Sequence, residues 1–485
     1  MKTFFTTMLL ILLTATLHSQ NINNTLGNGG AFTIKDASST FLSLSQSTGY
    51  LSLTNSLSLP LTTSSTLGVI FKGTDRFIHD YQASGTNGYN TFIGVNSGNF
   101  TMGGAATQAS NNTSVGYSSL ISLTTGSDNT AIGTNSLYSN TSGRQNSAFG
   151  YKALYSNTTG EGNSAFGNEA LYSNTTATGN SAFGDYALHS NTTGASNNAF
   201  GESSLAANTT GYENSALGYN SLVANTIGYW NSALGHKAMY SNTEGNKNSA
   251  IGWEALYFNT VGVRNSAFGS SSLHLATGSY NSALGESAGS DLTTGSNNTF
   301  IGYNAQPSSA TVSNEITLGD GSITTLRCQV ISITSLSDKR DKKNIRDLPF
   351  GLEFLMTVKP RLFNWDKREW YEEGKSNGSK IQKNPTAGFI AQELDEAQTQ
   401  ANAEWLNLVL KSNPEKLEAT SGNLLPIMVK SIQNLKSEND ALRKELTALR
   451  TLIAEQVTKE VKTVLLRAIQ NEATTQRVSL NKTSD

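Results

Sequence analysis

A 17-residue segment repeats along the middle of this chain. The consensus is N-S/T-A-F/L/I-G-x-x-A/S-L-x-x-N-T-T-G-x-x. Of the thirteen steps between successive starts, eleven are 17 residues, one is 16 and the first is 22. Seventeen residues are too few for a helical hairpin repeat, which needs more than about 30. Glycine-punctuated, short apolar runs predict strands, so each repeat should form one rung of a β-roll or β-solenoid. The repeats start at Asn90, Asn112, Asn129, Asn146, Asn163, Asn180, Asn197, Asn214, Asn231, Asn248, Asn265, Asn281, Asn298 and, degenerately, Glu315.

Two large apolar positions recur in every repeat and are predicted to stack as the core. They are the residue after the alanine, such as Phe149, and the leucine of the A-L pair, such as Leu154. The glycine between them, as at Gly150, suits positive φ or a close backbone approach. The asparagine of N-T-T-G is expected to adopt a left-handed conformation and to bond its own backbone.

Such a thin rung buries little apolar surface by itself, which favours a core shared among chains. A monomeric solenoid and an ice-binding ladder are the alternatives for this block. Adjacent threonines in N-T-T should point to opposite faces, which disfavours the flat threonine rows of an ice-binding surface. The repeats resemble the β-roll heads of trimeric autotransporter adhesins and, more closely, the repeats of secreted bacterial tail-fibre-like proteins.

Composition separates two kinds of sequence in one chain. Only 14% of the residues are charged, and 45 of the 70 charged residues lie from Ser337 onward. Lys and Arg (34) nearly balance Asp and Glu (36), so no global basic field would hold nucleic acid. The single cysteine, Cys328, excludes an intrachain disulfide.

The first residues predict export. Residues 1–19 combine Lys2, an apolar run from Met8 to Leu17 and the small residue Ser19, the pattern of a secretory signal peptide. The run is too short for a membrane anchor, so we expect a secreted or cell-surface protein with no membrane insertion after signal removal. Residues 20–89 alternate weakly and predict short strands that form a cap or attachment region. The repeats then form a shaft or head over residues 90–336.

Three sequence blocks follow the repeats in a fixed order. They are SDKRDKKNIRDLPFGLEFLMTVKPRLFNWD from Ser337, GFIAQELDEA from Gly388 and LLPIMVKSIQNL from Leu424. Together they resemble the C-terminal intramolecular chaperone of phage tail spikes and endosialidases, shared with myelin regulatory factor, over residues 337 to about 449. The resemblance implies a small α+β domain, over residues 337–423, that trimerises the upstream fibre and then cuts itself free.

The resemblance assigns the catalytic roles to Ser337 and Lys342, with the scissile bond between Leu336 and Ser337. A serine nucleophile needs a base, and no histidine follows Ser337, so a lysine base is the remaining option within this region. A lysine serves as a base when burial or a nearby cation lowers its pKa from about 10.4 toward 7–8. Asp341 stands where the family usually has an apolar residue, and a carboxylate near the lysine would weaken the base. The alternative is that Ser337 and Asp338 cap a short helix.

Apolar residues fall into heptads over residues 424–456, which predicts a coiled coil followed by a frayed tail over 457–485. The alternative is an amphipathic helix that packs on its own domain. The predicted seam consists of Leu425, Met428, Ile432, Leu435, Asn439, Leu442, Leu446, Leu449 and Ile453.

These features together predict a mainly β, exported homotrimeric fibre or adhesin-like protein with a self-cleaving chaperone. The peptidase activity would be that of a serine endopeptidase acting only in cis. An uncleaved surface-binding scaffold with a permanent trimerisation domain is the main alternative, and a secreted hydrolase is disfavoured because the repeats supply no paired carboxylates or histidine constellation. The expected partners are the chain itself and a surface glycan or protein receptor. No cofactor and no metal site are expected.

Overall fold

The computed structural model describes residues 31–35, 40–45, 51–53, 57–327 and 337–480. The predicted signal peptide, Leu336 and Cys328 lie outside these residues. The chain divides into two compact units, Met1–Trp253 and Glu254–Asp485. Each unit is described by itself below.

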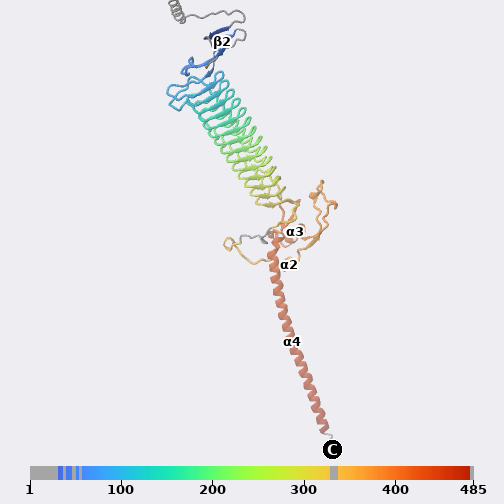
Figure 1. Cartoon of the computed structure of the whole chain (residues 1–485). Helices are drawn as coiled ribbons and strands as arrows, with labels where there is room; N and C mark the ends of the chain where they lie inside the picture. The colour runs from blue at the N-terminus through green and yellow to red at the C-terminus, as the bar shows by residue number, and fades with distance from the viewer. Residues whose placement is uncertain (1–30, 36–39, 46–50, 54–56, 328–336, 481–485) are drawn as a thin grey trace, which may run out of the picture. The chain divides into compact units, whose positions relative to one another are not determined.

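The first unit begins with short strands and continues into a β-solenoid (Figure 1). Strands β1 (Ala31–Lys35), β2 (Thr40–Ser45) and β3 (Leu51–Leu53) form a small antiparallel sheet. Strands β4 (Ile70–Lys72) and β5 (Asp75–His79) pair antiparallel, and β5 pairs with the first solenoid strand, so this hairpin caps that end of the solenoid sheet. The solenoid strands of this unit are β6 (Thr91–Ile93), β7 (Thr113–Val115), β8 (Thr130–Ile132), β9 (Ser147–Phe149), β10 (Ser164–Phe166), β11 (Ser181–Phe183), β12 (Asn198–Phe200), β13 (Ser215–Leu217), β14 (Ser232–Leu234) and β15 (Ser249–Ile251).

Each 17-residue repeat forms one coil with a single three-residue strand. Successive strands pair in parallel and in register, so that Ala165 lies between Ala148 and Ala182. Outside the strand, backbone groups still bond to the neighbouring coils: Leu154 N donates to Ala170 O at 3.0 Å. Gly150 has a φ of +139°, and a Cβ there would lie 2.2 Å from the carbonyl oxygen of Gly167. The predicted need for glycine at this turn is therefore confirmed.

The interior of the coils contains only one of the two predicted core positions. Leu154 and its equivalents are fully buried, whereas the second buried position is the strand alanine, as at Ala148. The prediction that Phe149 and its equivalents stack in the core is wrong. Side chains alternate across a strand, so an inward alanine places the next residue outside. Phe149, Phe166, Phe183 and Phe200 stack on the outer face with centroids 4.5–4.8 Å apart.

We call these outward positions the outer apolar column. Every solenoid strand of the first unit contributes one apolar residue to it, and the exposed fraction of these residues reaches 49%. The column consists of Ile93, Val115, Ile132, Phe149, Phe166, Phe183, Phe200, Leu217, Leu234 and Ile251.

Buried asparagines form two hydrogen-bonded ladders through the coils. In the first, the asparagine that opens each repeat bonds to the one in the previous coil: Asn163 Nδ2 donates to Asn146 Oδ1 at 3.2 Å. Asn163 Nδ2 also donates to Ala177 O at 2.8 Å, and its Oδ1 accepts from Asn180 N at 3.0 Å. In the second, Asn174 Nδ2 donates to Asn157 Oδ1 at 2.8 Å. The expectation for N-T-T-G is met in one part: Asn157 Nδ2 donates to its own backbone, at Gly160 O, at 3.1 Å. The other part is wrong, because this asparagine has no left-handed backbone, and it also bonds between coils.

The second unit contains further coils and the charged C-terminal region. Its solenoid strands are β16 (Ser266–Phe268), β17 (Ser282–Leu284), β18 (Thr299–Ile301) and β19 (Ile316–Leu318). The C-terminal elements are η1 (Lys339–Asp341), α2 (Leu352–Leu355), β20 (Arg361–Phe363), η2 (Arg368–Trp370), β21 (Thr386–Gly388), α3 (Ala391–Gln400), η3 (Glu404–Leu406), β22 (Val409–Leu410), β23 (Glu418–Ala419), η4 (Ser421–Leu424) and α4 (Leu425–Leu480).

The helix α4 contains 56 residues and continues through the segment 457–480, where a frayed tail was expected. Heptad spacing fails there, but residues 457–470 still carry good helix formers and contain neither proline nor glycine. Among the described residues, no helix combines the length and apolarity needed to cross a membrane.

The first ladder yields a test of solenoid stability. Asn180→Asp replaces the two Nδ2–H donors with an acceptor, leaving a buried carboxylate close to Asn163 Oδ1 and Gly194 O. We expect the unfolding free energy to fall by about 3 kcal/mol, the cost of an uncompensated buried charge. Asn198→Asp is the matched control, because Asn198 is exposed on the outer face and should change stability by less than about 0.5 kcal/mol. Urea unfolding followed by circular dichroism measures both, and equal losses would contradict the role of the ladder.

The cap of the solenoid yields a pH dependence. His79 is buried, its Nε2 donates to Ser97 O at 2.9 Å, and burial, aided by the nearby Arg76 charge, lowers its pKa from 6.5 to about 4. The folded pKa lies below the unfolded one, so the stabilisation is complete above pH 6.5 and is lost as the pH falls toward 4. The loss should reach up to about 3 kcal/mol.

The variant His79→Gln keeps an Nε2–H donor and does not titrate. The difference in unfolding free energy between wild type and this variant should therefore change between pH 7 and pH 4.5. Carboxylates titrate in both proteins, so the difference isolates the histidine. A constant difference across this range would contradict a depressed pKa at His79.

Candidate self-cleavage site in the C-terminal region

The segment that follows the repeats brings Ser337 and Lys342 together. Asp338 is the N-cap of η1: its Oδ1 accepts from Arg340 N at 2.8 Å and from Arg340 Nε at 3.1 Å. These bonds from Arg340 hold the pKa of Asp338 below its usual range. The resulting turn directs Lys342 back toward the start of the segment, where its Nζ donates a hydrogen bond to Ser337 Oγ.

The two side chains have the contact that a serine nucleophile and a lysine base require. Their surroundings differ from those of an active base, because every residue of the segment 337–347 is exposed. The lysine nitrogen is the donor in this bond, and an ammonium that donates to the hydroxyl cannot accept its proton. Within the described part of the chain, the Asp341 carboxylate forms no ion pair, so the weakening contact considered from the sequence is not observed there. Leu336, the other side of the predicted scissile bond, lies outside the described residues.

The same unit contains a small apolar core. It joins α2, α3 and the start of α4, with Phe354, Leu394 and Ile427 almost fully buried. Leu355 and Phe389 pack against this core. Leu362 and Trp365 lie outside it and are 73% and 43% exposed. Leu362 is the middle residue of the short strand β20, and Trp365 follows that strand and packs edge-on against Phe363, with ring centroids 5.2 Å apart.

Glu393 has a structural role, because it forms an ion pair with Arg361. Arg361 on β20 donates from Nε to Glu393 Oε2 at 2.8 Å and forms a second bond through its terminal nitrogen. This guanidinium contact, together with the positive charge of Lys359, holds the pKa of the Glu393 carboxyl below its usual range. A carboxylate held ionised by arginine is a poor proton donor, so this contact favours a structural role for Glu393.

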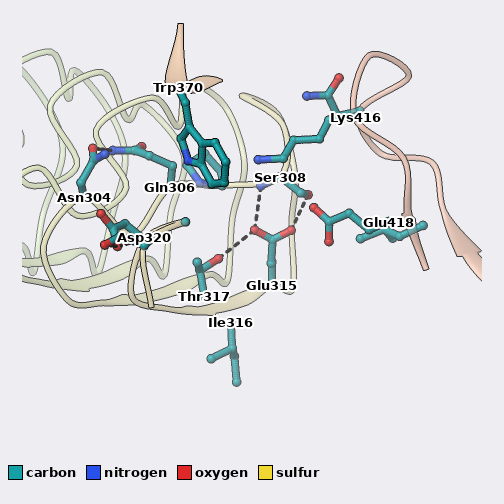
Figure 2. Close-up of a pocket in the computed structure, with 15 residues that line it drawn as sticks. Asn304, Gln306, Ser308, Glu315, Ile316, Thr317, Asp320, Trp370, Lys416 and Glu418 are labelled. Atoms are coloured by element: carbon teal, nitrogen blue, oxygen red, sulfur yellow. Dashed lines mark hydrogen bonds between the residues drawn. The ribbon is translucent and has the colours of Figure 1, made fainter. Parts of the chain in front are cut away.

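Glu315 ends the first asparagine ladder (Figure 2). Its backbone nitrogen donates to Asn298 Oδ1 at 2.9 Å, as the repeat asparagines do. Its carboxylate accepts from Ser308 N at 2.9 Å and from Thr317 Oγ1 at 3.1 Å. A carboxylate only accepts hydrogen bonds, so it cannot continue an amide ladder. Glu315, drawn in Figure 2 with its bonds to Ser308 and Thr317, is thus the end of the ladder, and the sequence indicated it only as a degenerate repeat start.

The predicted seam of α4 is exposed along the helix. Leu425, Ile432 and Leu442 are each 63–64% exposed, and Leu449 is 54% exposed. Asn439 accepts a bond from Arg443 Nε at 2.9 Å within the helix. The single chain therefore leaves these apolar side chains without a packing partner along most of α4. Within the described residues, no group of three or more His, Cys, Asp or Glu side chains is arranged to hold a metal ion.

The C-terminal segment matches a known family of protein domains. The family model described as chaperone of endosialidase (Peptidase S74) matches residues 337–402, which begin at Ser337 and include α2 and α3. No curated protein and no solved structure matched the chain. With the 17-residue β-solenoid that precedes it, this match fits a tail-spike-like protein with a C-terminal chaperone domain. The match ends before α4, whereas the sequence resemblance was expected to continue to about residue 449.

The apolar core of this domain can be tested with two matched truncations. Phe354→Ala should lower the unfolding free energy of the C-terminal domain by about 3 to 5 kcal/mol, because it opens a cavity at a side chain that is 5% exposed. Leu362→Ala removes an exposed apolar side chain and should cost less than about 0.5 kcal/mol. Hydrogen exchange of α3 reports on both. Similar protection in the two variants would show that the core is assigned incorrectly.

Proposed function

We propose that this chain is an exported, homotrimeric fibre whose C-terminal domain is an intramolecular chaperone that cleaves itself off between Leu336 and Ser337. The observation that carries the proposal is the hydrogen bond between Lys342 Nζ and Ser337 Oγ at the first residue of the matched chaperone segment. Export is supported by the signal-peptide pattern in residues 1–19.

The solenoid itself explains why such a chain needs a chaperone. Consecutive coils carry nearly the same sequence, so a strand that pairs one whole repeat out of register satisfies the same hydrogen bonds. The ladder of asparagines repeats with the same period and does not discriminate between registers. A C-terminal domain that joins three chains first would fix their ends at equal positions, and the repeats would then pair in step. The exposed seam of α4 supplies a surface for that first association.

Assembly would also control the cleavage. In the single chain the serine and lysine lie in solvent, which favours the charged ammonium over the neutral amine that a catalytic base requires. Packing of a second chain against the segment 337–347 would remove water from the pair. The hydroxyl proton of Ser337 would then pass to a neutral Lys342 amine as Oγ attacks the carbonyl carbon of Leu336. An acyl-enzyme ester would form, the Ser337 amine would leave with a proton, and water would release the Leu336 carboxylate.

This attack has a geometric peculiarity, because nucleophile and leaving amine belong to the same residue. An attack by Oγ on the carbonyl that precedes its own nitrogen is an N-to-O acyl shift, which passes through a five-membered ring. The ester then joins Leu336 to the side chain of Ser337, and hydrolysis separates the two fragments. The fibre would then be kinetically trapped in its assembled form. Once the C-terminal domain is gone, a fibre that unfolds could not refold.

A second candidate function is an uncleaved scaffold with a permanent trimerisation domain. Two observations favour it: Asp338 caps η1, so the segment has a structural role, and Asp341 stands where the family has an apolar residue. In either case the solenoid would offer a long repetitive face to a surface glycan or a protein receptor. The chain would act in the secreted or cell-surface compartment.

The cleavage is tested on the mature chain, which begins at Gln20. Denaturing electrophoresis and intact mass should give two fragments that meet at Leu336 and Ser337. Ser337→Ala and Lys342→Ala should remain whole, with the cleavage rate reduced by about a thousandfold or more. Lys343→Ala is the matched control and should be cleaved like wild type, because it is a neighbouring exposed lysine with no bond to Ser337.

Full-length protein in all four samples would favour the permanent trimerisation domain. In that case Asp341→Leu, which restores the family's apolar residue, should recover cleavage if the carboxylate is the cause. If Lys342→Ala is cleaved as fast as wild type, the proposed role of that lysine is wrong.

A further inference from the structure

We infer that the outer apolar column of the solenoid is the surface along which copies of this chain pack against one another. This inference rests on the self-association in the proposed function and adds the place of the contact in the repeats. The column faces outward from the parallel strands and is one residue wide. In the first unit it begins at Ile93 on β6 and ends at Ile251 on β15.

The first argument comes from comparison of the repeats within the chain. All ten solenoid strands of the first unit have an apolar residue in the column, although Val115, Leu217 and Leu234 are 36–49% exposed. The residue two positions after each column residue also faces outward, and its identity varies from coil to coil. It is a tyrosine at Tyr151 and Tyr219 and an acidic residue at Asp185 and Glu202. An exposed position with no partner would vary in the same way. Something other than solvation therefore keeps the column apolar.

The second argument is the area. Six of the ten residues are 36–49% exposed and leave on the order of 70 Å² each, and the other four leave less, so the column exposes on the order of 600 Å² per chain. A pair of such surfaces would bury about 1,200 Å², which is the lower end of the range of stable protein interfaces. Monomeric proteins rarely expose contiguous apolar patches larger than about 300–600 Å².

The third argument identifies a second copy of the chain as the occupant. The column repeats at the strand spacing of about 4.8 Å, with every residue in register with its neighbours. A surface that matches it at every step must have the same period, and a copy of this chain has that period. A glycan or an unrelated receptor would contact a few coils and would not favour apolar residues in all of them.

A separate feature of the chain supports the same occupant. The seam of α4 is also apolar and exposed, with Ile432 at 64% and Leu449 at 54%. The outer apolar column and the seam of α4 have different periods. Each is an exposed row of apolar side chains that could pack against the same row in a second copy of the chain. Association through α4 would bring the columns of the same chains into proximity. The column would then hold the fibre together once the C-terminal domain is released.

The decisive experiment labels the column in the full-length chain. Cys328→Ser removes the native thiol, and Leu217→Cys provides a single site for pyrene. We expect excimer fluorescence from the assembled protein, and we expect it to fall when labelled chains are assembled with an excess of unlabelled chains. Sedimentation velocity on the same samples gives the number of copies.

A charge substitution gives an independent measurement with a matched control. Leu217→Glu combined with Leu234→Glu places carboxylates in the column. Tyr219→Glu combined with His236→Glu changes the same two coils at the variable position, where Glu202 occurs naturally. We expect the first pair to shorten the protease half-life of the assembled repeats by at least about tenfold, because buried carboxylates would separate the chains. The second pair should leave the half-life unchanged.

The outcomes separate this inference from the proposed function. A trimer that shows no excimer, and that resists protease equally with both pairs of substitutions, would overturn the column as the interface and leave self-association intact. A monomer by sedimentation would overturn both. A trimer with an excimer and without cleavage would support the column while it contradicts self-cleavage.

Discussion

Hydrogen bonding between successive coils is the constraint on which the rest of this structure depends. Each coil has three strand residues, two kinds of buried apolar side chain and few other means of burying surface. Asparagine supplies the stabilisation that apolar burial does not. Its side-chain amide both donates and accepts, so the hydrogen bonds continue from one coil to the next. The same spacing excludes a side chain at Gly150, where neighbouring coils approach closely. The period of 17 residues is thus the length of chain that returns each asparagine to the one before it.

That regularity produces the two problems that the remainder of the chain addresses. Equal coils cannot specify their own register between chains, and a narrow coil leaves one apolar residue per strand in water. A C-terminal domain that associates first would solve the former, and packing of the outer apolar column would solve the latter. Ser337 and Lys342 stand at the junction of the two parts, so their chemistry would take place where a helper that is no longer needed can be removed.

Much of this architecture could be predicted from the sequence, and the failures have physical reasons. The period, the glycine turns and Leu154 were readable because the repeats show them many times. The contact between Ser337 and Lys342 followed from the family resemblance. Phe149 was misplaced because size suggested burial, whereas alternation along a three-residue strand decides which side chain points inward. The ladders were missed although each repeat opens with asparagine, since residue type alone does not reveal a bond between coils. The length of α4 exceeded the heptads because helix propensity continues where the seam ends.

Native mass spectrometry of the mature full-length chain tests the central claim most directly. The account requires three copies in one particle, or three copies of the repeat fragment after cleavage at Leu336 and Ser337. A single copy of the folded solenoid, with its outer apolar column and α4 seam stable in water, would contradict it.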